Sequence, residues 1–514
     1  MVVLFISEFI KVKHSVKKQQ SVRMKKIFFF LFIFPFLIIY SQAGKENRSG
    51  KKIYSLLKLY KIEGIDAEML QGFHEVWENR KAKQGRKIPI SVLVLPAKNK
   101  NSDKPPLFSL SGGPGGPGTD LLYRFTGDYK EMNNDRDIIM IDQRGTGKSN
   151  PLKCKFLDKR FMIENYLGEM YPEQVVKDCY KELSKIADLT QYTTPNVADD
   201  INEIREWLGY DKIDIIGFSY GTRLAQVYLK RHPETVNDII LWGAVTTSMK
   251  MPLHHASDAQ RAIDLLFKDC ADDSVCSKVY PHIKDEFNSI VETLRTGNIK
   301  MQYKHPQIDS AVTLTFHEYD FTETIRRIMY SQAGQRQVPY LIHEFYNKNY
   351  KPFLDWIYPK DLTSEGDFAD GMYLSVSCTE DVPYLDVYTA HKLDYGTYLG
   401  NYRVEQQQRA CDCWTKGELP EDYFEPVHSD KPVLIISGYM DPITPPDLGK
   451  EILKYLPNGK QTVIRYLSHS STGLRNINYL VDYMLEFLNE NSTADLDESK
   501  LKFLEPVDFK LPNN

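Results

Sequence analysis

The sequence lacks an apolar run long enough to span a bilayer. Its most apolar segment, residues 27–40, is short of the roughly 20 residues that a membrane-spanning helix needs. Lys25 and Lys26 precede this segment, and small residues ending at Ala43 follow it, which is the pattern of a secretory signal. We therefore expect a signal peptide over residues 1–43, cleaved after Ala43, and a secreted or periplasmic protein with no stable membrane anchor.

The chain also lacks an excess of basic residues. Met24 would be a more typical start for the signal, so we interpret residues 1–23 as an over-extended start. Removal of residues 1–43 would change the formal net charge from −4 to −10, because these residues hold seven Lys or Arg and one Asp or Glu. An acidic protein of this kind is poorly suited to bind phosphate backbones, so we expect no nucleic acid partner.

Repeats and long low-complexity segments are absent too, which is typical of a folded globular body. Hydrophobic residues make up 42% of the 514 residues and charged residues 26%, close to the averages for soluble proteins. The 32 Tyr and 25 Phe argue against extensive disorder. Because the chain exceeds the length of one ordinary core, we expect either one domain with a large insertion or two domains.

Cysteine is scarce but present, and its spacing is a poor match to a metal site. Cys411 and Cys413 are separated by one residue, whereas zinc sites of this kind have a gap of two or more. In the oxidising compartment that a signal peptide implies, disulfides are the usual state. Proximity in the sequence suggests three pairs and one odd thiol: Cys154 with Cys179, Cys270 with Cys276, and Cys378 with either Cys411 or Cys413.

Apolar and amphipathic segments alternate along most of the chain. Strands are predicted at residues 88–95, 107–110, 137–141, 213–216, 238–242, 432–437 and 462–466, and helices at residues 196–208, 222–228 and 476–488. Such alternation predicts an α/β fold, with a mostly parallel sheet and helices on both faces.

The alternation is interrupted once, late in the chain. Between residues 247 and 425 the segments are helical or irregular and rich in Tyr. We interpret this region as a largely helical cap inserted into the core. The predicted organisation is therefore a first core part at 44–246, a cap at 247–425, a second core part at 426–490 and a tail at 491–514.

A serine stands between two glycines at a predicted strand-to-helix turn. Residues 217–221 read Gly-Phe-Ser-Tyr-Gly and follow the strand at 213–216. This pattern is typical of a nucleophile elbow, because the turn strains the serine backbone and brings strand and helix so close that the flanking positions must lack side chains. Ser219 is thus the predicted nucleophile.

Two further residues complete a predicted catalytic triad. A serine hydroxyl needs a histidine to take its proton and an acid to orient that histidine. Asp441 and His469 each follow a predicted strand near the end of the chain. The order Ser219, Asp441, His469 is that of the alpha/beta-hydrolases.

A glycine-rich segment, residues 111–118, directly follows the strand at 107–110. We expect the backbone amide of Tyr220, and one from this segment, for which we favour Gly113, to form the oxyanion hole. Residues 145–149, Gly-Thr-Gly-Lys-Ser, look like the end of a phosphate-binding loop. Asp142 stands where that loop requires its first glycine, however, so we expect no nucleotide site.

Three segments together resemble the prolyl aminopeptidase and tripeptidyl aminopeptidase group of alpha/beta-hydrolases: residues 112–115, 142–149 and 217–222. The resemblance extends from about residue 88 to residue 488, and its C-terminal part is similar to the tripeptidyl aminopeptidase type. The chain departs from the group at Ser111, where His is common, and at Ser470, where Gly often follows the catalytic His.

The resemblance implies a serine aminopeptidase that acts on peptides with a free N-terminus and releases either single residues, such as proline, or tripeptides. It also implies cap carboxylates that hold the substrate ammonium group, for which Glu380 and Asp381 beside Cys378 are candidates, the alternative being solvated surface carboxylates. No cofactor or metal is called for. The rival interpretations are a carboxylesterase with the same triad and a non-catalytic binding module, and the oligomeric state stays open.

Overall fold

The computed structural model describes residues 52–154, 167–304, 311–357 and 368–512. The predicted signal peptide and over-extended start lie outside these residues. Within the described part of the chain, no helix is both long enough and apolar enough to cross a membrane.

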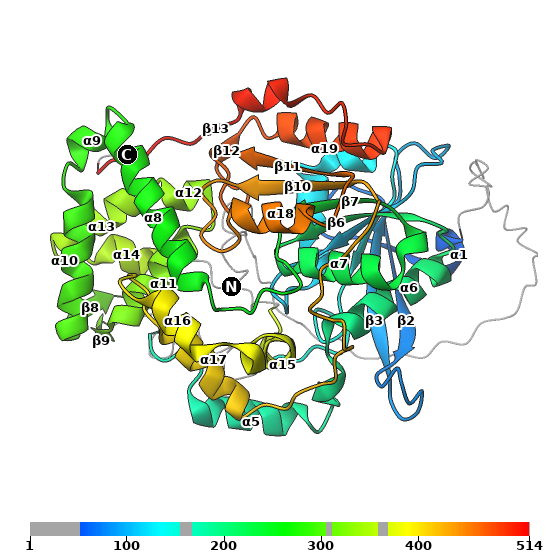
Figure 1. The fold of residues 1–514 in the computed structure, drawn as a ribbon, viewed down its shortest axis with the longest axis horizontal. Helices are drawn as coiled ribbons and strands as arrows, with labels where there is room; N and C mark the ends of the chain where they lie inside the picture. Colours follow the sequence, from blue (N-terminus) through cyan, green and yellow to red (C-terminus); the bar gives the residue numbers. More distant parts are fainter. Residues whose placement is uncertain (1–51, 155–166, 305–310, 358–367, 513–514) are drawn as a thin grey trace, which may run out of the picture.

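A nine-stranded sheet forms the centre of the protein (Figure 1). The strand order is β1-β2-β3-β5-β4-β6-β7-β10-β11. In this order, neighbours from β1 to β5 pair antiparallel. The remaining neighbours, from β5 through β4, β6, β7 and β10 to β11, pair parallel. The strands are β1 (Lys58–Tyr60), β2 (Met69–Trp77), β3 (Lys87–Leu95), β4 (Leu107–Leu110), β5 (Ile138–Ile141), β6 (Ile213–Phe218), β7 (Val236–Trp242), β10 (Val433–Gly438) and β11 (Gly459–Ile464). The predicted mostly parallel sheet is confirmed.

The parallel strands bury both faces, because helices cover the sheet on each side. In β6, Ile213 and Ile215 pack against the core under one set of helices, and Ile216 and Phe218 pack against the core on the other face. The first face carries α6 (Thr194–Leu208), α7 (Tyr220–Arg231) and α18 (Pro446–Leu453), and the second carries α2 (Leu122–Thr126) and α19 (Asn478–Glu490).

The last strand begins earlier than the sequence predicts. β11 spans Gly459–Ile464 rather than residues 462–466, and Gly459 pairs with Val433 at the start of β10. As the edge strand of the sheet, β11 leaves one side unpaired, so its polar first residues need no burial and give no apolar signal. The predicted boundary is therefore wrong by three residues at its start.

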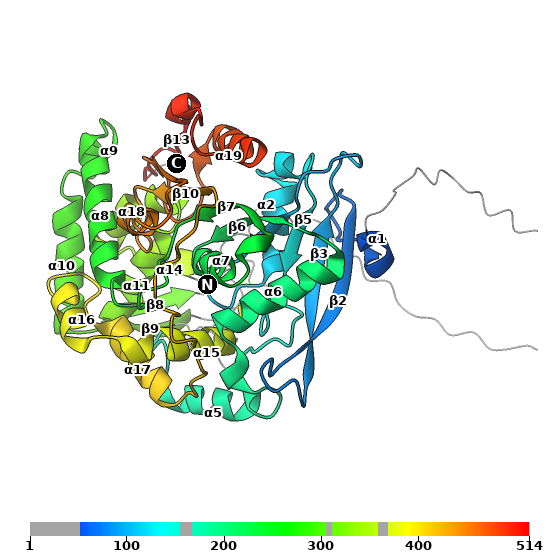
Figure 2. The ribbon, with the colours of Figure 1, turned by 45° about the vertical axis from the view of Figure 1, so that its right-hand side comes forward.

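The region between β7 and β10 contains a third hydrophobic core, and its helices lie on the side of the molecule away from β2 (Figures 1 and 2). Helices and a two-stranded antiparallel hairpin that the sequence did not predict surround it: α8 (His255–Asp272), α10 (Ile283–Thr296), α11 (Glu318–Ile328), α13 (Val338–Tyr346), α14 (Lys351–Ile357), β8 (Ile299–Lys304) and β9 (Ala311–Phe316). The exact division at residues 247 and 425 stays a prediction.

One helix of this region packs against the core beside the nine-stranded sheet instead. α15 (Asp370–Glu380) is buried along its whole length, as expected of a helix covered on all sides. The side chains of Met372, Leu374 and Val376 join the same core as α6 and α7. Cap and core are therefore packed through a continuous interior at this point.

Three disulfides are formed among the described residues. Cys154 bonds to Cys179 and Cys270 to Cys276, as predicted. Cys378 of α15 bonds to Cys411 of α17 (Tyr402–Asp412), which leaves Cys413 as the half-buried free thiol. The alternative that the sequence left open is thus resolved in favour of Cys411.

Candidate active site

Ser219 stands at the turn between β6 and α7. Its backbone has φ 56° and ψ −124°, a conformation of the kind that costs a non-glycine residue about 1–3 kcal/mol. A Cβ atom at Gly217 would lie 2.5 Å from the carbonyl oxygen of Gly221, and one at Gly221 would lie 2.3 Å from that of Leu110. Both flanking positions therefore require glycine, for the reason that the sequence pattern suggests.

His469 and Asp441 form a hydrogen-bonded pair. Nδ1 of His469 lies 2.8 Å from Oδ2 of Asp441, whose side chain is fully buried. Oδ1 of Asp441 accepts hydrogen bonds from the backbone amides of Ile443 and Thr444 at 2.8 and 2.9 Å. Burial alone would raise the pKa of Asp441, but His469 and these hydrogen bonds hold it below its ordinary value. An ionised Asp441 accepts a hydrogen bond from Nδ1–H of His469 and leaves Nε2 available as a base.

The end of β7 contacts both the serine and the histidine. The amide of Ser219 donates to the carbonyl of Trp242 at 2.9 Å, and Nε1 of Trp242 donates to the carbonyl of His469 at 3.2 Å. A Cβ atom at Gly243 would lie 3.2 Å from Cε1 of His469. Ser219, Asp441 and His469 thus gather at one edge of the sheet, where β6, β10 and β11 end.

Thr444 is a site residue that the sequence analysis missed. Its Oγ1 donates to Oδ2 of Asp441 at 2.7 Å and lies 3.1 Å from Nδ1 of His469. The signal was present in the sequence, because a hydroxyl residue three positions after an Asp in a turn often bonds to that Asp. Thr444 therefore orients the carboxylate against the imidazole.

We expect Thr444→Val to lower kcat of the enzyme. A hydrogen bond to a charged group contributes about 1.5–3 kcal/mol, which corresponds to a fall in rate of about tenfold or more. The measurement is kcat for an activated ester. Thr462→Val is the matched control. Thr462 is also buried, and its hydroxyl forms a hydrogen bond of 2.8 Å with the hydroxyl of Tyr483, which is not part of the site. Equal kcat values in the two variants would contradict the role of Thr444.

The glycine-rich loop lies directly against the serine. A Cβ atom at Gly112 would lie 2.9 Å from Cβ of Ser219, and Gly113 has φ +123°, a conformation that favours glycine. Oγ of Ser111 donates to the carbonyl of Gly116 at 2.6 Å, and Gln143 donates to the carbonyl of Ser111 at 3.2 Å. Ser111 thus closes the loop on itself beside Ser219, and the oxyanion hole of Gly113 and Tyr220 stays a prediction.

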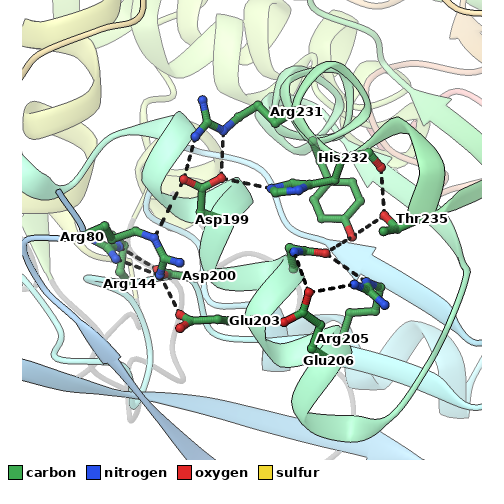
Figure 3. A network of polar contacts seen from close by, with 12 residues as sticks. Arg80, Arg144, Asp199, Asp200, Glu203, Arg205, Glu206, Arg231, His232 and Thr235 are labelled. Carbon is green, nitrogen blue, oxygen red and sulfur yellow. Dashed lines mark hydrogen bonds and ion pairs between the residues drawn. The ribbon is translucent and has the colours of Figure 1, made fainter. Parts of the chain in front are cut away.

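The segment that looks like a phosphate-binding loop has a different task in this structure. Asp142 occupies its centre and accepts hydrogen bonds from the amide and hydroxyl of Thr119 and the amide of Lys148. Arg144 is fully buried and makes two hydrogen bonds to Asp200 of α6, at 2.6 and 2.8 Å, within the polar network that Figure 3 shows. Residues 142–149, the loop after β5, are therefore attached to α6 through the hydrogen bonds of Arg144 with Asp200.

Glu380 lies in a fully buried position at the end of α15. It accepts hydrogen bonds from the amide and the hydroxyl of Thr194 at 2.6 Å each, and from the hydroxyl of Tyr423. Burial raises the pKa of Glu380, although Arg223 and these donors act in the opposite direction. Its carboxylate is therefore engaged by core and cap donors rather than solvated.

Asp381, the next residue, is fully buried as well. Its Oδ1 accepts from Nη1 of Arg223 at 2.9 Å and from the amide of Met251 at 3.2 Å. Burial raises its pKa, and Arg223 opposes that shift. Oδ2 of Asp381 has no hydrogen-bond partner among the described residues. Both carboxylates thus join the cap to the core, and neither is a surface group.

Comparison with known families agrees with this geometry. A family model described as alpha/beta hydrolase fold matches residues 105–279, and one described as TAP-like protein matches residues 396–497. The chain thus has an alpha/beta-hydrolase fold, as the sequence predicts. The two matches cover the segments that carry Ser219 on one side of the cap and Asp441 and His469 on the other.

The relatives of this chain include named peptidases. It is 30% identical to the serine protease Hip1 of Mycobacterium tuberculosis over 36% of this chain and 39% of that protein. It is 27% identical to a tripeptidyl aminopeptidase of Streptomyces lividans over 34% of this chain and 35% of that protein. The matches thus span less than half of each relative, and they confirm the resemblance to this peptidase group.

Solved structures with similar chains have much lower identity. An esterase from Exiguobacterium antarcticum is 14% identical, with a TM-score of 0.35, over 78% of this chain and 96% of that chain.

Proposed function

We propose that this protein is a secreted or periplasmic serine exopeptidase that releases residues from the free N-terminus of peptides. The observation that carries the proposal is the hydrogen-bonded pair of His469 and Asp441, placed at the sheet edge where Ser219 stands on its strained turn. The peptidase relatives support peptides as the substrate class. Three disulfides are compatible with an oxidising compartment.

In the proposed mechanism, Nε2 of His469 takes the proton of Ser219 as its Oγ attacks the carbonyl carbon of the scissile bond. Asp441 stabilises the imidazolium that forms. The backbone amides of Tyr220 and Gly113 hold the negatively charged oxygen of the tetrahedral intermediate. His469 then gives its proton to the leaving amine, and a water molecule, deprotonated by the same histidine, releases the acyl group from Ser219. None of these steps requires a metal or a cofactor.

An exopeptidase of this type needs an acceptor for the substrate ammonium group, and Glu380 and Asp381 stay the proposed residues. Of the carboxylate oxygens of these two residues, Oδ2 of Asp381 has no hydrogen-bond partner in the described part of the chain, so it is the atom to which an ammonium group would bind. Binding there requires that the cap open enough to expose a fully buried carboxylate.

A carboxylesterase is the second candidate function. The observation that favours it is the engagement of Glu380, whose two oxygens already accept hydrogen bonds from Thr194 and Tyr423. Without a free carboxylate in the cap, the same triad would act on esters that carry no ammonium group.

A paired panel of arylamides separates the two functions. Prolyl, alanyl and tripeptidyl arylamides, each with a free and a blocked N-terminus, are tested against the mature protein and a Ser219→Ala variant. We expect cleavage that requires the free amine and is lost in the variant. Cleavage of simple esters alone would favour the esterase, and no turnover that depends on Ser219 would favour a non-catalytic binding module.

A further inference from the structure

A short cap segment, residues 329–335, contacts both loops that carry the acid and the base. The amide of Ser470 donates to the carbonyl of Tyr330 at 2.9 Å, and the amide of Ala333 donates to the carbonyl of Thr472 at 3.1 Å. The ring of Tyr330 also meets the imidazole of His469 edge to face, with centroids 5.2 Å apart. The histidine loop is therefore held from the cap as well as from the sheet.

Gln335, at the end of the short helix α12 (Gln332–Gln335), is the residue that reaches both loops at once. Its Nε2 lies 3.0 Å from the carbonyl of Met440 and 3.1 Å from Oγ of Ser468. Met440 immediately precedes Asp441, and Ser468 immediately precedes His469. A single amide group thus joins the residue before the catalytic acid to the residue before the catalytic base.

Gln335 has one more contact within the cap, and its Oε1 has no hydrogen-bond partner among the described residues. Its Nε2 also lies 3.0 Å from the carbonyl of Met329, which accepts a hydrogen bond from Oγ of Ser468 at 2.6 Å. Gln335, Met440 and Ser468 have no exposed surface. Water therefore cannot replace the amide if it is removed, and a buried carbonyl without a donor costs about 1–3 kcal/mol.

We infer that Gln335 is a positioning residue for catalysis, which holds the loops of Asp441 and His469 in register through one buried amide. The inference rests on the proposed function, since Gln335 would position the acid and the base of the proposed triad. It acts through the neighbouring residues Met440 and Ser468 and touches no reacting atom. The cap would thus have a part in assembling the triad in addition to covering the substrate.

The reason to expect an effect on rate is geometric. Asp441 and His469 follow two neighbouring parallel strands, β10 and β11, but each lies several residues beyond its strand end. The ladder between the strands ends at Gly438 and Ile464. Beyond it, the amides of Tyr439 and Met440 donate to the carbonyls of Ile464 and Leu467 at 3.0 and 3.1 Å. The side chain of Gln335 adds a further link between the two loops. A displacement of about 1 Å in a catalytic group can lower the rate by about 10²-fold.

The test compares Gln335→Met with Gln332→Met in the full mature chain. Methionine keeps the length and the burial of the side chain and removes the amide. Gln332 is the matched control, because it lies on the same helix and is 1% exposed. Its Oε1 accepts a hydrogen bond from Nε of Arg336, which lies within the cap. Thermal midpoints and active-site titration with a fluorophosphonate report the folded fraction of each variant.

We expect Gln335→Met to lower kcat for a p-nitrophenyl ester, and the rate constant for fluorophosphonate labelling of Ser219, by about 10–100-fold per reactive serine. KM should change little, and Gln332→Met should retain the wild-type rates. Ser468→Ala, which removes the contact on the histidine side alone, should lower kcat in the same direction by a smaller factor. This second variant keeps the test decisive if Gln335→Met does not fold.

Equal rates per reactive serine in the wild type and in folded Gln335→Met, or in folded Ser468→Ala, would overturn the inference and leave the proposed function standing. The same holds if Gln332→Met loses as much rate as Gln335→Met. Wild-type labelling that disappears in Ser219→Ala supports the proposed function separately. A wild-type protein that a fluorophosphonate does not label at Ser219 would overturn both.

Discussion

Asp441→Asn is expected to lower kcat by about 10⁴-fold while the fold is retained, by analogy with the same exchange in other serine triads. The carboxylate of Asp441 accepts four hydrogen bonds, from His469, from the amides of Ile443 and Thr444, and from the hydroxyl of Thr444. The NH₂ group of the asparagine side chain cannot accept a hydrogen bond, so it would face at least one of these four donors without pairing with it. If the NH₂ group faces Nδ1, His469 must carry its proton on Nε2, where it can no longer accept the proton of Ser219.

Asp447→Asn is the control for this change. Asp447 lies six residues further along, and its side chain is 81% exposed, so the same chemical exchange should leave kcat unchanged. Both variants are measured with an activated ester and with the best free-amine arylamide. A kcat for Asp441→Asn within tenfold of the wild-type value would mean that another acid orients His469, and it would count against the proposed triad.

The hydrolase core could be predicted because its elements leave local signals. Buried parallel strands are continuous apolar runs, and the elbow needs glycine on both sides of its serine. Strands at or next to the sheet edges give weaker signals: β2, which lies beside the edge strand β1, exposes half of Phe73, and the edge strand β11 begins with polar residues. Their places in the sheet are decided by pairing with a neighbour rather than by their own composition.

The contacts of the cap could not be predicted from the sequence in the same way. The sequence indicates Glu380 and Asp381 as candidates for holding the substrate ammonium group, and that role stays a prediction. Their partners Thr194 and Arg223 lie on helices of the core that are far away in the chain. Gln335 carries no pattern at all, because its role depends on two loops more than 100 residues away. Such residues become visible only once the chain is folded.

The structure also gives a reason why the catalytic parts need the cap. α15 is fastened to α6 and α7 by two buried carboxylates, and the backbone amide of Ala369 donates to the carbonyl of Gly115 in the glycine-rich loop at 2.9 Å. Earlier in the chain, α12 contacts the loops of the acid and the base. The glycine-rich loop and the loops of Asp441 and His469 are thus in contact with the cap, and opening the cap for a substrate would disturb them.

Arg144→Met is expected to destabilise the protein by about 3–5 kcal/mol, because it leaves a buried carboxylate without its main partner. Arg144 makes its two hydrogen bonds to Asp200 and donates to the carbonyls of Glu78 and Gln191 at 2.9 Å each. Asp200 is 2% exposed and, among the residues that the structure describes, would keep its hydrogen bond with Arg80 at 2.6 Å as its remaining side-chain partner (Figure 3). The measurement is the thermal midpoint, which we expect to fall by several degrees.

Arg231→Met serves as the control, since the ion pair of Arg231 with Asp199 is partly exposed and such pairs contribute about 0–1 kcal/mol. Adding Asp200→Leu to Arg144→Met should restore part of the lost stability, because the unpaired charge is then removed. If the segment is structural, as these contacts indicate, kcat per folded molecule is unchanged in Arg144→Met and ATP does not raise the midpoint of the wild type. A rise with ATP would instead show that the segment binds a nucleotide, because a ligand stabilises the folded state to which it binds.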